Sequence, residues 1–109
     1  MEIMKNQLHT DPKDVTLSQA MFALSDPLRL RIVALLDTNG EMHCGDIYRA
    51  LGITKTAASH HFKVLRESGL VWRDHHGLQQ SARLRRPEFD AAFPGLLDAV
   101  LNNFDERSA

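Results

Sequence analysis

The stretch LGITKTAASHHFKVLRESGLVWRDHHGLQQSARLRR, residues 51–86, decides the fold of this chain. Its first half predicts a helix that begins after Thr54, a good N-cap residue, and ends at Gly69. The apolar side chains of this helix recur at helical spacing, at Ala58, Phe62 and Leu65. Its second half predicts a strand over 70–73, a turn centred on 75–77 and a return strand over 79–85. The stretch therefore predicts a helix followed by a β-hairpin.

A shorter helix is predicted just upstream, over residues 43–51. Gly52 follows it and suits the left-handed backbone that ends many helices. Two helices joined by so short a turn, with a glycine in it, form a helix-turn-helix. The hairpin behind the second helix makes the unit a winged helix-turn-helix.

Capping signals place two more helices before this unit. Thr16 and Gln19 have the spacing of a capping box and open a helix that ends near Ser25. Asp26 and Pro27 are typical of the start of a helix, which we predict over 27–37. The apolar face of this helix consists of Leu28, Ile32, Leu35 and Leu36. Arg29 and Arg31 are expected to point away from this face.

After the hairpin, Pro94-Gly95 separates a short helical turn over 87–92 from a final helix near 95–104. The final helix has a broad apolar face, which a chain this small needs a partner to cover. The residues of this face are Leu96, Leu97, Val100, Leu101 and Phe104.

Length and composition predict one compact domain of mainly α structure with a small β-hairpin: the chain has 109 residues, of which 43% are hydrophobic. We place this domain at 15–104, after a flexible N-terminal arm of residues 1–14 and before a C-terminal tail of residues 105–109. The arm lacks the apolar run of a signal peptide or a membrane span. Cys44 is the only cysteine, so no internal disulfide forms. Both features favour a cytoplasmic location and no membrane partner.

Charge is unevenly distributed, although the formal net charge is only -1. Residues 1–54 carry five Lys or Arg and seven Asp or Glu, residues 55–86 carry seven and two, and residues 87–109 carry one and five. The helix and hairpin therefore form a basic segment between two acidic ones. Because basic side chains neutralise phosphates, this pattern predicts double-stranded DNA as the partner.

The helix face opposite the apolar residues supplies candidates for contacts in the major groove. These candidates are Lys55, Thr56, Ser59, His60 and Lys63. His61 lies about 100° further around the helix and is expected to turn toward the interior. The hairpin candidates are Arg73, His76, Gln79, Arg83 and Arg85. The arginines are favoured for phosphate contacts because their charge does not depend on pH, whereas the hairpin tip also fits a plain solvated turn.

Two stretches resemble the signatures of the ArsR/SmtB family of bacterial repressors: LSDPLRLRI at 24–32 and TAASHHFKVLRESGLV at 56–71. The resemblance covers roughly residues 17–103 and implies a homodimeric winged-helix protein that binds a pseudo-palindromic operator and represses a nearby promoter. It implies dimerisation through the first and last helices, with Leu17 and Met21 contributed by the first. It assigns base reading to Lys55, Thr56, Ser59 and His60, and it leaves open a small-molecule effector.

The resemblance also identifies metal sites that this chain lacks. Where metal-sensing members carry a Cys-x-Cys pair, this sequence has His43 and Gly45. No His or Cys follows His76, so the family's site on the last helix is absent as well. Asp74 and His76 share a strand face, but no further ligand is expected near them. We therefore expect no metal and no cofactor, and we expect Cys44 to be a buried free thiol.

Two other functions are alternatives to that of a DNA-binding regulator. A protein-interaction or antitoxin-like winged-helix module would use the apolar last helix to engage a different protein. An enzyme is disfavoured, because Ser59 and His60 point about 100° apart on one helix and no acid orients them. We expect no catalytic residues.

Overall fold

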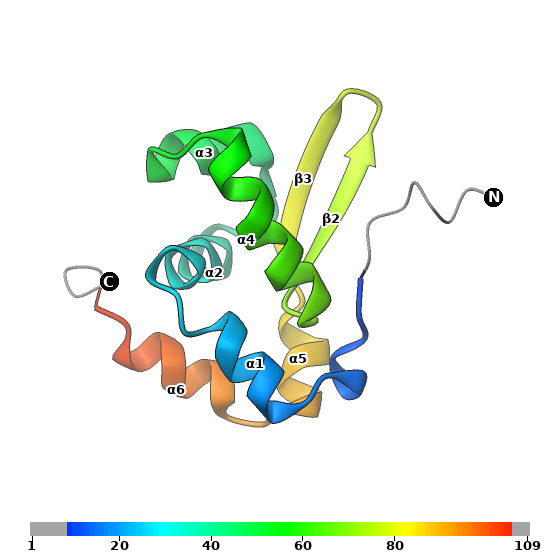
Figure 1. Ribbon diagram of the computed structural model, residues 1–109, viewed down its shortest axis with the longest axis vertical. Helices are drawn as coiled ribbons and strands as arrows, with labels where there is room; N and C mark the ends of the chain where they lie inside the picture. The colour runs from blue at the N-terminus through cyan, green and yellow to red at the C-terminus, as the bar shows by residue number, and fades with distance from the viewer. Residues whose placement is uncertain (1–8, 106–109) are drawn as a thin grey trace.

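The computed structural model describes residues 9–105, which form a winged helix-turn-helix (Figure 1). The helices are α1 (Leu17–Ala23), α2 (Pro27–Asn39), α3 (Cys44–Leu51), α4 (Lys55–Glu67), α5 (Arg86–Ala92) and α6 (Leu96–Asn103). A 3₁₀ helix, η2 (Pro12–Asp14), precedes them, and the strands are β1 (Met42–His43), β2 (Val71–His76) and β3 (Gln79–Leu84). The predicted fold class is confirmed.

The predicted caps fix the starts of α1 and α2. The Thr16 hydroxyl accepts a bond from the Gln19 amide (3.1 Å), and the Gln19 side chain accepts one from the Thr16 amide (2.8 Å). The Asp26 carboxylate accepts from the amides of Leu28 (2.9 Å) and Arg29 (3.0 Å). These bonds satisfy amides that have no partner inside a helix.

The helix-turn-helix consists of α3 and α4. Gly52 ends α3 with a φ of +66°, as predicted, and the Thr54 hydroxyl accepts from the Ala57 amide (3.0 Å) to cap α4. The apolar face of α4 is fully buried, as predicted, through Ala58, Phe62 and Leu65. Burial of this face fixes which side of α4 points outward.

The wing differs from the prediction at its tip. The predicted turn centre, 75–77, is wrong, because His75 and His76 remain paired in the sheet with Gln80 and Gln79. Gly77, with a φ of +66°, and Leu78 form the two-residue turn. A left-handed backbone at glycine is what a tight hairpin of this kind requires.

Sequence patterns did not predict strand β1. It pairs with β3, which lies between β1 and β2 in the sheet, and places Met42 opposite Ala82 and His43 opposite Ser81. Two residues are too few to show an alternating pattern, so only tertiary pairing makes this segment a strand.

Residues 9–14, which fall in the predicted flexible arm, pack on the domain. The His9 ring stacks on Trp72 with centroids 4.0 Å apart, and Pro12 is buried. Gly69 has a φ of +76° and lies so close to Pro12 that an added Cβ would be 2.8 Å from the proline ring. The packed part of the chain therefore extends past the predicted boundary at residue 15. Residues 1–8 and 106–109, the remainder of the predicted arm and most of the tail, lie outside the described residues.

One core unites the elements, and its largest fully buried side chains are Phe62, Phe89, Ile32, Leu36, Ile47, Leu65, Leu70 and Leu97. Figure 1 shows the tip of the β2–β3 hairpin at one end of the molecule and α1 and α6 at the other. The tip of the wing therefore lies far from the two flanking apolar helices.

Candidate nucleic-acid interface

The outer face of α4 presents all five of the predicted polar residues to solvent. Exposed side chains are Lys55, Thr56, Ser59, His60 and Lys63. The Ser59 hydroxyl donates to the Lys55 carbonyl (2.9 Å), which leaves its oxygen lone pairs available to a ligand. The face offers charged and neutral hydrogen-bonding groups along about two helical turns, which is the length that a recognition helix uses in a major groove.

A groove of about 350 Å³ joins the start of α3, the start of α4 and the tip of the wing. Lys55 and Gln79, predicted from separate elements, both line it, together with Arg49 and Gln80. Sequence reasoning missed Arg49, because it lies in an acidic segment and its guanidinium pairs with Asp46. The groove therefore connects the start of α4 with the tip of the wing.

The wing places its predicted residues in two environments. His76 and Gln79 are exposed near the tip, and Arg83 is half-buried with its guanidinium 5.9 Å from the centre of the Trp72 ring. Leu78, which sequence reasoning also missed, is fully exposed at the turn. These residues are accessible to DNA.

Arg73 and Arg85 are buried, which contradicts their prediction as phosphate contacts. Arg73 is 9% exposed and lies 4.9 Å over the Phe62 ring; Arg85 is 8% exposed and lies 5.2 Å over the Trp72 ring. Arg85 also donates to the Thr10 carbonyl (3.0 Å). Arginine stems are apolar, and their guanidinium groups stack on aromatic rings, so the fold turns these two cations inward.

Arg86 also counted toward the basic segment, but acidic residues surround it. Its guanidinium pairs with Asp90 (3.2 Å), Asp37 (3.6 Å) and Asp98. These ion pairs connect α5 with α2 and α6. Arg86 therefore contributes to the packing of these helices and is not a free positive charge on the wing.

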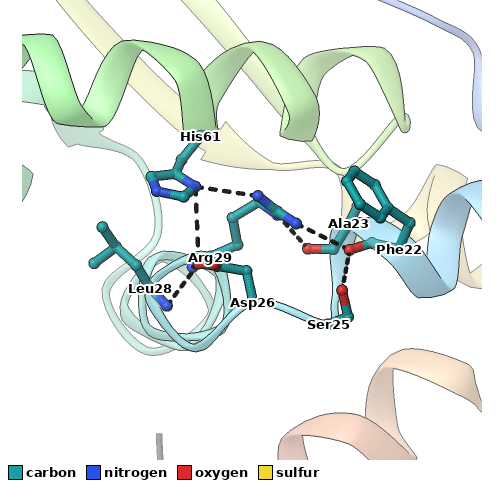
Figure 2. Close-up of polar contacts among 7 residues, drawn as sticks. All are labelled: Phe22, Ala23, Ser25, Asp26, Leu28, Arg29 and His61. Atoms are coloured by element: carbon teal, nitrogen blue, oxygen red, sulfur yellow. Dashed lines mark hydrogen bonds and ion pairs between the residues drawn. The ribbon is translucent and has the colours of Figure 1, made fainter.

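A polar link on the inner side of α4 connects it to α1 and α2 (Figure 2). Arg29, 4% exposed, donates to the carbonyls of Ala23 (2.8 Å) and Phe22 (3.0 Å) at the end of α1. The same guanidinium lies 3.1 Å from His61 Nδ1 on α4. The prediction that Arg29 points away from the core is wrong, because α1 supplies carbonyl acceptors that helix periodicity does not reveal.

His61 turns inward, as predicted, and its ring is held between two charges. The nitrogen facing Arg29 is also 3.7 Å from the Asp26 carboxylate. Because a guanidinium only donates, Nδ1 accepts and carries no proton in this arrangement. Burial lowers the pKa of His61, and Arg29 and His60 lower it further, whereas Asp26 opposes the shift. The neutral imidazole is the form that fits this link.

Apolar side chains lie exposed at the opposite end of the molecule. Leu17 and Met21 on α1 are 55% and 54% exposed, as a dimer face requires, and Phe22, which was not predicted, is 61% exposed. The half-buried residues are Leu96, Val100 and Leu101 on α6 and Phe104 directly after it. Leu97 is wrongly predicted for this face: it is fully buried in the core of its own chain.

The metal-ligand prediction requires one correction. Glu41 lies beside Asp74 and His76, and the ligand atoms of all three are within 4.8 Å of one another. The pairing of β1 with β3 brings Glu41 close to Asp74 and His76. The sequence did not predict this contact, because Glu41 is more than 30 residues away from the other two in the chain. Cys44 is a buried free thiol, as predicted.

Comparison with known proteins agrees with this fold. A family model described as a helix-turn-helix domain matches residues 24–71. The HTH-type transcriptional regulator YceK of Bacillus subtilis is 38% identical over 84 residues, 76% of this chain and 84% of the relative. The HTH-type transcriptional regulator CmtR of Mycobacterium tuberculosis is 35% identical over 95 residues, 86% of this chain and 79% of the relative.

Among solved structures, the transcriptional repressor BigR of Xylella fastidiosa superposes with a TM-score of 0.65 at 32% identity, covering 82% of this chain and 86% of that one. The ArsR family regulator RHA00566 shares the fold, with a TM-score of 0.62 at 17% identity, covering 90% of this chain and 100% of that one. The protein is thus a winged helix-turn-helix transcriptional regulator. The chain belongs to the ArsR/SmtB family, whose members are DNA-binding regulators and not enzymes.

Within residues 9–105, no helix has the length and apolar character needed to cross a membrane.

Proposed function

We propose that the chain is a sequence-specific repressor that binds a pseudo-palindromic operator as a homodimer and lacks the usual metal sites of its family. The observation that carries this proposal is the exposed polar face of α4, which the adjoining groove connects to the tip of the wing. The family positions that would hold a thiolate pair carry His43 and Gly45. The repressor role is supported by the relatives named as repressors, SdpR of Bacillus subtilis and BigR.

In this proposal α4 enters a major groove and reads bases through Lys55, Thr56, Ser59 and His60. Lys63 and Arg83 neutralise phosphates on either side, and His76 and Gln79 contact the backbone or minor groove from the wing. Arg73 and Arg85 have no part in it, because their guanidinium groups are committed to the interior.

Residues 15–104 would serve both DNA binding and dimerisation. The exposed side chains of Leu17, Met21 and Phe22 support dimerisation, because apolar side chains that cluster on one surface commonly mark an interface. A symmetric dimer would place two copies of α4 in successive major grooves, about 34 Å apart.

Electrophoretic mobility-shift assays on the fragment upstream of the protein's own gene test the DNA-binding proposal. The wild-type chain should bind a specific fragment, and His60→Ala or Lys55→Ala should weaken that binding by about 1–2 kcal/mol, roughly 5- to 30-fold. Lys13→Ala is the matched control, since Lys13 is exposed on η2, outside the proposed surface. Circular dichroism checks that every variant is folded. Equal losses for Lys13→Ala and Lys55→Ala, or no specific binding at low salt, would refute the proposal.

The exposed apolar face of α1 also supports a second candidate, a module that engages a different protein instead of its own copy. Size-exclusion chromatography with light scattering separates the two. A stable homodimer that Met21→Glu and Phe22→Glu convert to a monomer supports the repressor. A chain that is monomeric at micromolar concentration supports the alternative.

A further inference from the structure

Three side chains of metal-binding chemistry meet on one face of the sheet, outside the surface proposed for base reading. Glu41 precedes β1, whereas Asp74 and His76 lie two residues apart on β2. Their carboxylate oxygens and imidazole nitrogen all lie within 4.8 Å of one another. The strand order β1-β3-β2 explains this meeting, because β3 pairs with both outer strands and places Ser81 opposite Asp74.

Neighbouring donors orient the two carboxylates. The Ser81 hydroxyl donates to Glu41 Oε2 (2.5 Å), and the Trp72 indole N–H donates to Asp74 Oδ1 (2.9 Å). Each carboxylate keeps a second oxygen for another ligand. Hydrogen bonds of this kind orient ligating carboxylates in established metal sites.

The charges of this cluster call for a cation. Two carboxylates at this separation repel each other, and within residues 9–105 neither forms an ion pair with Lys or Arg. A single divalent ion between them would compensate both charges. His76, whose side chain completes the cluster, adds the nitrogen donor that selects a transition metal over Mg²⁺ or Ca²⁺.

We propose that Glu41, Asp74 and His76 bind a first-row divalent transition-metal ion such as Zn²⁺. One oxygen from each carboxylate and one imidazole nitrogen supply three ligands, and water completes the coordination. Ligands about 2.1 Å from a tetrahedral ion lie roughly 3.4 Å from one another, and the three ligand atoms here, all within 4.8 Å of one another, approach that spacing. Glu41 and His76 are exposed, whereas Asp74 is half-buried.

This site uses none of the positions at which the resemblance to the ArsR/SmtB family places metal, and it does not rest on the proposed repressor function. It would tie wing strand β2 to the segment before β1, and it would engage His76, which the proposed function gives to DNA. Metal binding by the free chain is measured without DNA, so the two proposals fail independently.

Isothermal titration calorimetry of the chelator-treated full chain with ZnCl₂ tests the proposal. One ion per chain should bind, and Glu41→Gln and His76→Gln should each weaken binding by at least about 10- to 100-fold. His75→Gln is the matched control, because His75 is the next residue on β2 and its side chain points to the other face of the sheet. Circular dichroism verifies that the exposed-site variants are folded.

Absorption spectra with Co²⁺ identify the ligands. Oxygen and nitrogen ligands should give weak visible bands without the intense ultraviolet band of a thiolate, and Cys44→Ser should leave both spectrum and affinity unchanged. The proposal is wrong if the wild-type chain binds neither ion, if binding survives both Glu41→Gln and His76→Gln, or if it is lost in Cys44→Ser or His75→Gln.

Discussion

Helix α4 and the wing are both basic in sequence, but they place their cations differently. Lys55 and Lys63 on α4 point to solvent, whereas Arg73 and Arg85, both near the base of the wing, fold onto the aromatic rings of Phe62 and Trp72. The sequence segment that carries most of the positive charge therefore exposes only part of it. The exposed cations lie mainly on α4 and in the groove beside it, whereas the tip of the wing, residues 75–80, contains no Lys or Arg.

The difference lies in how each element fixes its side chains. When one face of a helix is buried in the core, the residues on the opposite face point to solvent. A two-stranded ribbon has two faces, and a long arginine at its base reaches either solvent or a nearby ring. The position of a Lys or Arg in the sequence therefore predicts its exposure better on α4 than in the hairpin.

The largest effect is expected from the link that holds the inner side of α4. Arg29→Ala leaves the carbonyls of Phe22 and Ala23 without their donor and removes the partner of His61. We expect the free energy of unfolding to fall by about 3 kcal/mol, measured by urea denaturation followed by circular dichroism. Arg31→Ala, on the same helix, is the control and should cost less than about 1 kcal/mol. Equal losses would mean that the link does not hold α4.

Two arginines of the wing should respond in opposite ways. Arg85→Ala removes a buried bond to Thr10 and the contact with Trp72, so the free energy of unfolding should fall by about 2 kcal/mol. Arg83→Ala removes only a longer contact with Trp72, so it should lower the free energy of unfolding by less than about 1 kcal/mol and mainly weaken DNA binding. Denaturation and fluorescence-anisotropy titrations on both variants measure the two effects. If Arg83→Ala were the more destabilising substitution, the assignment of inward and outward arginines would be reversed.

The exposed lysines of α4 should control how DNA affinity depends on salt. Lys63→Gln removes one phosphate contact, which should reduce the slope of log affinity against log salt concentration by about 0.9. Binding titrations at several salt concentrations give this slope. Lys13→Gln, outside the surface, should leave it unchanged, and an unchanged slope for Lys63→Gln would remove Lys63 from the interface.

The smallest expected effect is a pH dependence of the free energy of unfolding, to which His61 contributes and its neighbour His60 does not. Because burial lowers the pKa of His61 below its ordinary value of 6.5, the unfolded chain binds a proton more readily than the folded chain. The contribution of His61 to stability is therefore fully present above the unfolded-state pKa of 6.5, and it is lost as the pH falls toward the lower folded-state pKa.

Urea denaturation between about pH 7.5 and 5.5 measures this dependence. His61→Gln should flatten it, whereas His60→Gln, at the exposed neighbouring position, should leave it in place. The opposite outcome would show that the inner and outer faces of α4 have been exchanged.

Local signals in the sequence were sufficient for most of the secondary structure. The capping residues Thr16, Asp26 and Thr54 each make the bonds that their positions predict. A cap acts within three residues, and a helix repeats every 3.6 residues, so both are encoded in contiguous sequence. The same locality made the outer face of α4 predictable and assigned His61 to its inner side.

Tertiary structure alone decided features that depend on residues far apart in the chain. The acceptors for Arg29 belong to another helix, the ring that draws Arg73 inward lies on α4, and β1 exists only because β3 pairs with it. That pairing also brings Glu41 to Asp74 and His76. The winged helix-turn-helix and its polar recognition helix were predictable from the sequence, because they follow from short-range periodicity and capping. Which cations remain outside, and which acids and histidines meet, was decided by packing, since burial depends on the partners that folding supplies.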